Sequence, residues 1–234
     1  KDGTRLHPLP NKPFHIHLCL THPDVRRISI ERMLMLIGRQ KERTFFTVSP
    51  GDGYDWCQCE RCQALDAVPG VNVTDRYLDF VNEVARAVAT EFPDQKILAI
   101  AYTEATSTPP ARVSPEPNVF VVYCTYAPHT RCHLHDLTCE QNQQARADLE
   151  GWLRLCPGQV GVFDYPKCYP LYHDPFNPFR AMKRKLDYYA GKDIRFIGWC
   201  VAPRSFLDLF LYVQSKQAWD PQVDVDSLTR SEER

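Results

Sequence analysis

The sequence predicts an α/β domain built around a parallel sheet. Short apolar runs rich in valine, isoleucine and phenylalanine alternate along the chain with longer segments whose apolar residues recur every three or four positions. The short runs are typical of buried strands and the longer segments of amphipathic helices. Several of the runs end in turn-forming residues next to a carboxylate. Strands that alternate with helices in this way are typical of parallel strands joined by helical crossovers.

The first elements are a strand, a helix and a second strand. Phe14–Leu20 alternates in polarity and is predicted to be a strand. Residues 25–38 carry apolar side chains at helical spacing, with Thr21 or Asp24 as the expected N-cap. Thr44–Ser49 is a β-rich apolar run that breaks into a Ser-Pro-Gly-Asp-Gly turn. We expect this turn to lie at the carboxyl edge of the sheet.

The later elements follow the same alternation. A helix is expected from Thr74 or Asp75 to the residue before Pro93. Lys96–Tyr102 and Asn118–Cys124 are almost wholly apolar, as expected of strands buried on both faces. They are followed by a helix at 143–155, a strand at Gln159–Tyr165, a helix from Pro178 to Tyr189, a strand at Arg195–Val201 and a final helix from Leu207.

These elements make six strand–helix steps in one α/β domain covering residues 1–234. Eight steps would close a barrel, so two strands are unaccounted for. An open, doubly wound parallel sheet is the alternative. The chain opens on KDGTRLHPLP, which suggests a fragment of a larger protein.

The composition limits the classes of partner. A formal net charge of −1 gives no electrostatic reason for binding nucleic acid or an anionic membrane surface. No apolar run is long enough to predict a membrane-spanning helix. Aromatic residues make up 12% of the chain, which suits a carbohydrate site, although an aromatic core is the commoner reason for such a content.

Acidic and aromatic residues follow several predicted strands. Asp52, Glu104 and Asp164 come after three different strands, whose carboxyl ends share the edge of the sheet where ligands bind. Glycoside hydrolysis uses two carboxyl groups, or one together with an acetamido group of the substrate. The alternative for each acid is a turn or helix cap. The predicted substrate-binding residues are Trp56, Tyr102, Tyr123, His135, Tyr165 and Trp199.

Cysteines form a second candidate site. Three of them are spaced C-x-C-x-x-C, namely Cys57, Cys59 and Cys62. The predicted loop 125–142 adds Cys132, His133, His135 and Cys139. Three thiolates with Cys132 as the fourth ligand would make a structural zinc site. Disulfides (Cys57–Cys62 or Cys132–Cys139) and buried thiols are the alternatives. A catalytic zinc is less favoured, because no H-E-x-x-H pattern is present.

Several motifs together resemble one bacterial family. Ser49–Asp66 reads S-P-x-D-G and then W-C-x-C-x-x-C-x-A-L-D. The other matching segments are L-C-L-T-H-P-D, D-R-Y-L-D-F-V-N-E-V-A, R-C-x-x-H-x-L-x-x-C-x-x-N and W-D-P-x-x-D-V-D. This set resembles the domain of unknown function 4838 family, which overlaps glycoside hydrolase family 163, a group of endo-β-N-acetylglucosaminidases.

The resemblance implies a (β/α)8-type barrel whose first strands precede this chain. It also implies hydrolysis of N-acetylglucosamine-containing glycans, with a glycan or glycoprotein as partner and no cofactor required for catalysis. Asp52 or Glu104 would be the general acid, the substrate acetamido group the nucleophile, and Asp164 with Tyr165 would orient the substrate. Family members are usually exported. The alternative function is a non-catalytic glycan-binding or structural barrel domain with a zinc- or disulfide-stapled cysteine loop.

Overall fold

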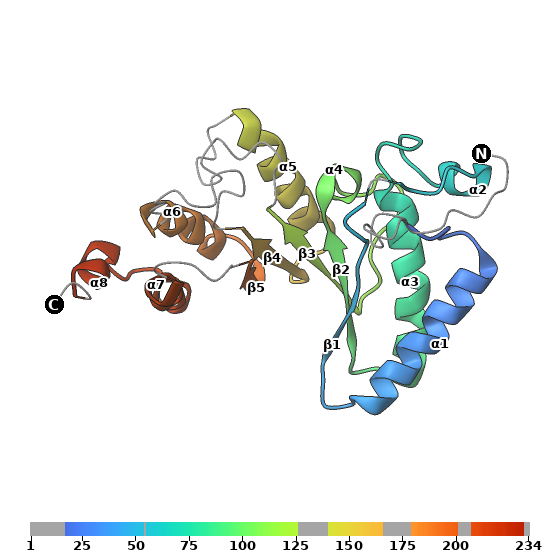
Figure 1. The fold of residues 1–234 in the computed structure, drawn as a ribbon, viewed down its shortest axis with the longest axis horizontal. Helices are drawn as coiled ribbons and strands as arrows, with labels where there is room; N and C mark the ends of the chain where they lie inside the picture. Colours follow the sequence, from blue (N-terminus) through green and yellow to red (C-terminus); the bar gives the residue numbers. More distant parts are fainter. Residues whose placement is uncertain (1–16, 54, 126–139, 166–178, 201–206, 232–234) are drawn as a thin grey trace.

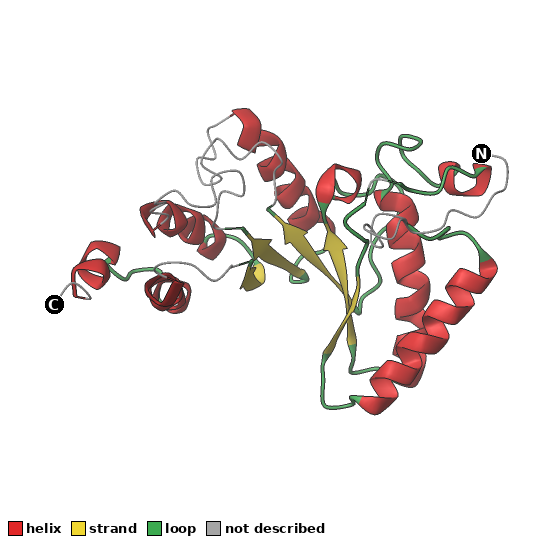
Figure 2. Ribbon diagram, in the orientation of Figure 1, coloured by secondary structure: helices red, strands yellow, loops and turns green. Residues whose placement is uncertain are grey.

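The computed structural model describes residues 17–53, 55–125, 140–165, 179–200 and 207–231. The helices are α1 (Pro23–Arg39), α2 (Glu60–Gln63), α3 (Thr74–Glu91), α4 (Thr103–Thr106), α5 (Glu140–Leu155), α6 (Phe179–Ala190), α7 (Leu207–Trp219) and α8 (Val225–Ser231). The strands are β1 (Phe45–Val48), β2 (Lys96–Ala101), β3 (Val119–Cys124), β4 (Val160–Asp164) and β5 (Ile194–Trp199). Figure 2 shows how strands and helices alternate along the chain.

The strands form one parallel sheet in the order β1-β2-β3-β4-β5. The predicted α/β class with a parallel sheet is therefore confirmed, and the five described strands do not close into a barrel. The strand order never reverses, whereas a doubly wound sheet requires a reversal. All five carboxyl ends lie at one edge, so the residues that follow the strands share that edge.

One predicted strand is wrong over the part of it that the structure describes. Residues 17–20 of the predicted strand Phe14–Leu20 are loop, and residues 14–16 lie outside the described part of the chain. Among the described residues the sheet has five strands, where six were predicted for the whole chain. The other strand predictions agree with the structure to within two residues at each end. The short helices α2 and α4, and α8 after the last predicted helix, had no sequence prediction.

The predicted helix caps also differ from the observed ones. His22 caps α1, and its Nδ1 accepts a hydrogen bond from the Asp24 N–H at 3.2 Å. Thr21 is thereby free to lie elsewhere, beside the cysteines. Thr74 and Asp75 lie inside α3 rather than at its cap, and the Thr74 N–H donates to Asn72 Oδ1 at 3.0 Å.

The main core lies between the sheet and the helices. α1 and α3 pack against each other beside β1 and β2, and α6, α7 and α8 lie at the far end beyond β5 (Figure 1). The strand residues of this core include Phe46, Ile97, Val121 and Val162. A smaller cluster of Phe179, Phe210, Val213 and Val225 joins α6, α7 and α8.

The opposite face of the sheet is curved and only partly covered. β2 alternates between buried and half-buried residues, so the expectation of burial on both faces is not met. Phe45 of β1 is 42% exposed. Its ring centroid nevertheless lies 5.4 Å from that of Phe120 in β3 and 6.3 Å from that of Phe196 in β5. Strands in a flat sheet are about 4.8 Å apart, which would separate β1 from β5 by about 19 Å. This face is therefore strongly concave.

Candidate functional site

Four cysteine side chains converge next to the carboxyl end of β1. Cys19 precedes α1, and Cys57, Cys59 and Cys62 follow β1. Their sulfurs all lie within 4.8 Å of one another. Cys19 Sγ is 3.8 Å from Cys59 Sγ and 3.7 Å from Cys62 Sγ. Each of the four is a free thiol, so the alternative Cys57–Cys62 disulfide is not formed.

These spacings match the geometry of a tetrahedral metal centre. Four sulfurs held at about 2.3 Å from one ion lie about 3.8 Å apart. A disulfide would bring two sulfurs to about 2.05 Å. The Cys19–Cys59 and Cys19–Cys62 sulfur pairs therefore already have the spacing that a bound metal ion requires.

The local chain explains how the cysteines converge. Cys59 is the N-cap of α2, and its carbonyl oxygen accepts hydrogen bonds from the N–H groups of Cys62 and Gln63, both at 3.0 Å. This tight turn brings the Cys59 and Cys62 side chains toward Cys19. The Thr21 hydroxyl joins them, with its Oγ1 3.2 Å from Cys62 Sγ.

The electrostatics of the cluster favour one thiolate. Burial opposes ionisation of Cys62, but hydrogen bonds from Thr21 and from the Arg76 guanidinium outweigh it and lower its pKa to about 6. Burial raises the pKa of Cys57 to about 12. The surroundings thus favour the thiolate form of Cys62, next to Thr21 and Arg76, and oppose that of Cys57.

Arg76 ties the cluster to the rest of the fold. Its side chain is 1% exposed, and its Nε lies 3.0 Å from Oδ1 of the buried Asp66. Its Nη1 donates to the carbonyl oxygen of Cys57 at 2.6 Å. Arg112, from the segment before β3, donates to the carbonyl oxygen of Asp66 at 2.6 Å. Burial raises the pKa of Asp66, against the opposing effects of the Gly70 N–H and Arg76.

The sequence predicted three of the four cysteines in the cluster. The predicted fourth ligand, Cys132, lies outside the described residues, together with His133, His135 and Cys139 of the same loop. The structure instead brings in Cys19. Its only sequence signal was its place in the L-C-L-T-H-P-D segment, which also contains Thr21. Its distance of 40 positions from Cys59 concealed the relationship.

The three predicted acids occupy different environments. Asp52 is exposed in the turn after β1. Glu104 lies in α4, directly after β2, and follows Thr103, which has a φ of +60°. A β-branched residue rarely adopts this left-handed conformation, and such outliers cluster at functional sites.

Asp164, at the end of β4, is fully buried. Its Oδ1 accepts hydrogen bonds from Thr125 Oγ1 at 2.6 Å and from the Tyr165 N–H at 2.7 Å. It also forms an ion pair with the Nζ of Lys185, which α6 contributes and which is itself buried. These contacts give Asp164 a structural role, because it joins β4 to Thr125 and to α6.

The predicted aromatic residues divide by burial. Tyr102, Tyr165 and Trp199 are half-buried at the sheet edge. Tyr123 is buried, and its hydroxyl donates to the carbonyl oxygen of Ala145 at 3.0 Å. Trp56 is also buried: its ring stacks on that of His17 at a centroid distance of 3.8 Å, and the Arg76 guanidinium lies 5.7 Å from its centroid.

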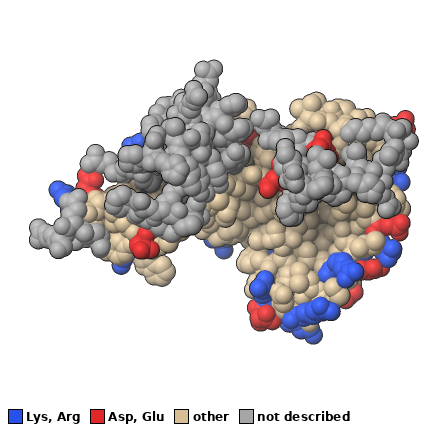
Figure 3. Space-filling model, viewed as in Figure 1, with Lys and Arg blue, Asp and Glu red and all other residues tan. Residues whose placement is uncertain are grey.

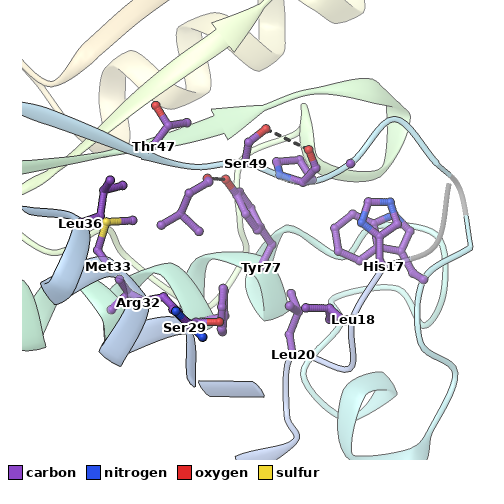
Figure 4. A pocket seen from close by; sticks show the side chains of 16 residues that line it. His17, Leu18, Leu20, Ser29, Arg32, Met33, Leu36, Thr47, Ser49 and Tyr77 are labelled. Carbon is purple, nitrogen blue, oxygen red and sulfur yellow. Dashed lines mark hydrogen bonds between the residues drawn. The ribbon is translucent and has the colours of Figure 1, made fainter. Parts of the chain in front are cut away.

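A pocket of about 420 Å³ lies between α1, α3 and β1. Its walls are mainly apolar, with His17 and Trp56 at one end and Arg32 and Ser29 on α1. Figure 4 shows Tyr77 reaching from α3 across the pocket toward the end of β1. Its hydroxyl donates to the carbonyl oxygen of Val48 at 2.5 Å.

The described part of the face in Figure 3 carries no dominant charge. Figure 3 shows basic and acidic side chains interspersed over the region of α1, whereas the surface over the sheet in this view has few of either. Among the described residues, no helix has both the length and the apolar character that a membrane span requires.

The fold and site define an α/β protein with a parallel sheet and a four-cysteine cluster at the edge where its strands end. The sequence matches the family called Domain of unknown function (DUF4838) over residues 1–231, and the chain belongs to that family. No curated protein and no solved structure matches the sequence.

Proposed function

We propose that Cys19, Cys57, Cys59 and Cys62 hold one structural Zn²⁺ ion. The sulfur–sulfur distances of 3.7 and 3.8 Å carry this proposal. Four thiolates are a soft donor set that suits zinc, and a set of four protein ligands leaves no coordination position for a substrate. The centre would therefore stabilise the fold instead of taking part in a reaction.

In this proposal, the metal centre joins the segment before α1 to the loop after β1. These two segments are far apart in the sequence. A metal ion bound by both would therefore fix the position of the turn that carries Asp52. In the apo protein the same thiols would be open to oxidation, which gives the metal a protective role as well.

The expected result is one zinc ion per chain in protein purified without chelator, measured by inductively coupled plasma mass spectrometry. Cys19→Ser should lower the zinc content severalfold and reduce the melting temperature. Cys156→Ser, which alters a buried thiol outside the cluster, is the matched control and should retain the metal. Full zinc content in Cys19→Ser would contradict the assignment of Cys19.

We further propose that the sheet is part of a (β/α)8-type barrel. In an eight-stranded barrel the fifth strand lies opposite the first, and the interior is just wide enough for side chains to fill it. The 6.3 Å separation of Phe45 and Phe196, from the first and fifth strands, supports this geometry. The unreversed strand order supports it too.

Hydrolysis of N-acetylglucosamine-containing glycans is the second proposed function. The left-handed Thr103 next to Glu104 favours it, because strain at a strand end is a feature of active sites. Glu104 or Asp52 would donate the proton to the leaving group, and the acetamido group of the substrate would attack the anomeric carbon. Asp164, held by Lys185, would position the neighbouring Tyr165. An exported enzyme acting on glycoproteins fits this chemistry.

Release of N-glycans from a glycoprotein, measured by mass spectrometry, tests this second function. Wild type should release glycans, and Asp52→Asn or Glu104→Gln should reduce release by about 100-fold or more if the substituted group is the acid. Glu91→Gln, at the opposite end of α3 from the cysteine loop, is the control and should be fully active. If the folded, zinc-loaded wild type released no glycans, the proposed hydrolysis would be wrong and only the proposed structural zinc centre would stand.

A further inference from the structure

We infer that Arg76 is the positioning residue through which the metal centre holds the turn carrying Asp52. This inference rests on the zinc centre proposed above, and adds to it a route by which metal binding orders the sheet edge. The route runs from the carbonyl oxygen of Cys57 through the side chains of Arg76, Trp56 and His17 to the carbonyl oxygen of Gly53.

The first half of the route joins the centre to Trp56. Arg76 is 1% exposed and donates from Nη1 to the carbonyl oxygen of the ligand residue Cys57 at 2.6 Å. The same guanidinium lies 5.7 Å from the ring centroid of Trp56. A cation beside an indole face is attracted to it, most strongly where water is excluded, and Trp56 is only 6% exposed.

The second half joins Trp56 to the turn. The His17 ring lies parallel to the Trp56 ring, with an angle of 3° between their planes and 3.8 Å between their centroids. His17 Nε2 lies 2.7 Å from the carbonyl oxygen of Gly53, the residue after Asp52. Figure 4 shows His17 at the end of the pocket nearest this turn. Trp56 thus contacts both a cation anchored at the cysteine loop and a ring that contacts the turn.

The charge of the centre explains why metal matters to this route. A zinc ion with four thiolates carries a net negative charge, and Arg76 is the buried cation that donates into its loop. Its other anionic partner, Asp66, is already shared with the Gly70 N–H at 3.1 Å. Loading the centre therefore stabilises the guanidinium in the position that packs Trp56. Removing the metal weakens that position and, through it, the turn.

Hydrogen exchange of the amides at residues 51–53, followed by mass spectrometry with and without bound zinc, tests the inference. In wild type, zinc should slow exchange there on the order of tenfold. In Arg76→Met, zinc should still bind but give little protection at 51–53. In His17→Phe, which keeps a ring on Trp56 but loses the bond to Gly53, zinc affinity should be unchanged and the protection lost. Arg86→Met, on the exposed side of α3, should behave as wild type.

The outcomes separate the two proposals. If wild type binds zinc but exchange at 51–53 is identical in the loaded and metal-free states, the positioning role of Arg76 is overturned and the zinc centre stands. Full protection in His17→Phe overturns that role as well, and does so even if Arg76→Met fails to fold. Wild type that binds no zinc overturns both the metal centre and the route built on it.

Discussion

The rings of Phe45 and Phe196 lie 6.3 Å apart, although three strands separate the strands that carry them. Side chains can meet across such a gap only if the sheet curls, so that the first and fifth strands face each other. Glycines make room for this contact. A methyl group on Gly161 of β4 would overlap the ring of Phe196. The concave face is thus packed by phenylalanine rings lying over glycines.

Gly161→Ala should destabilise the protein by about 1–3 kcal/mol, because the added methyl group forces the Phe196 ring out of its place. Urea unfolding measures the effect. Gly38→Ala in α1 is the matched control, since its new methyl group would meet no atom within 4 Å, and it should be neutral or stabilising. The double variant Gly161→Ala with Phe196→Leu should recover part of the loss. Equal stability of Gly161→Ala and wild type would contradict the packing described.

Tyr77→Phe should cost about 1–3 kcal/mol, because it leaves two partly buried backbone groups without their hydrogen-bond partner. The Tyr77 hydroxyl donates to Val48 O at 2.5 Å and accepts from the Ile100 N–H at 2.8 Å. The hydroxyl takes the place of the next backbone hydrogen bond between β1 and β2. The chain after Val48 therefore leaves the sheet at this point. Thermal unfolding measures the loss. Tyr188→Phe, whose hydroxyl bonds the partly exposed Glu150, should cost much less.

Thr21→Val should weaken zinc binding by about 10–100-fold, the usual effect of removing a hydrogen bond to a metal ligand. The hydroxyl lies 3.2 Å from Cys62 Sγ, and valine has the same shape without it. Competition with a chromogenic chelator measures the affinity. Thr21→Ser keeps the hydroxyl and should bind nearly as well as wild type. If valine and serine variants bound zinc equally, the hydroxyl would have no part in the centre.

Glu150 should contribute to stability at neutral pH and lose that contribution in acid. Burial opposes its ionisation, but hydrogen bonds from Lys192, Tyr188 and Arg146 outweigh burial and lower its pKa. An acid with a lowered pKa in the folded state stabilises the fold above its unfolded pKa of about 4.3, and the contribution disappears as the pH falls through the folded pKa. The melting temperature of Glu150→Gln should therefore approach that of wild type as the pH is lowered from 6 toward about 3. Glu31→Gln, on the exposed face of α1, is the control.

Much of the architecture could be predicted from local pattern. The helices α1, α3, α5, α6 and α7 were predicted, as were all five strands of the sheet. Helix periodicity and strand hydrophobicity are properties of neighbouring residues, which is why the sequence reveals them. Failures came where tertiary contacts override local preference. His22 caps α1 while Thr21 turns toward the cysteines.

The candidate site was predictable only in part, for the same reason. The C-x-C-x-x-C spacing predicts that Cys57, Cys59 and Cys62 lie together, because a single turn of chain connects them. Cys19 is distant in sequence, and only the packing of α1 on α3 brings it there. Asp164 could be placed at a strand end, but its burial against Lys185 depends on where α6 lies.

The sequence by itself determined the α/β class, the family and the three clustered cysteines, since each is written in residues close together along the chain. Only the tertiary structure decided that Cys19 completes the cluster, that Arg76 lies buried beneath it and that Phe45 faces Phe196. These relationships join residues from different elements. They arise when the helices bury their apolar faces on the sheet and the sheet curls, and no local pattern records how far it curls.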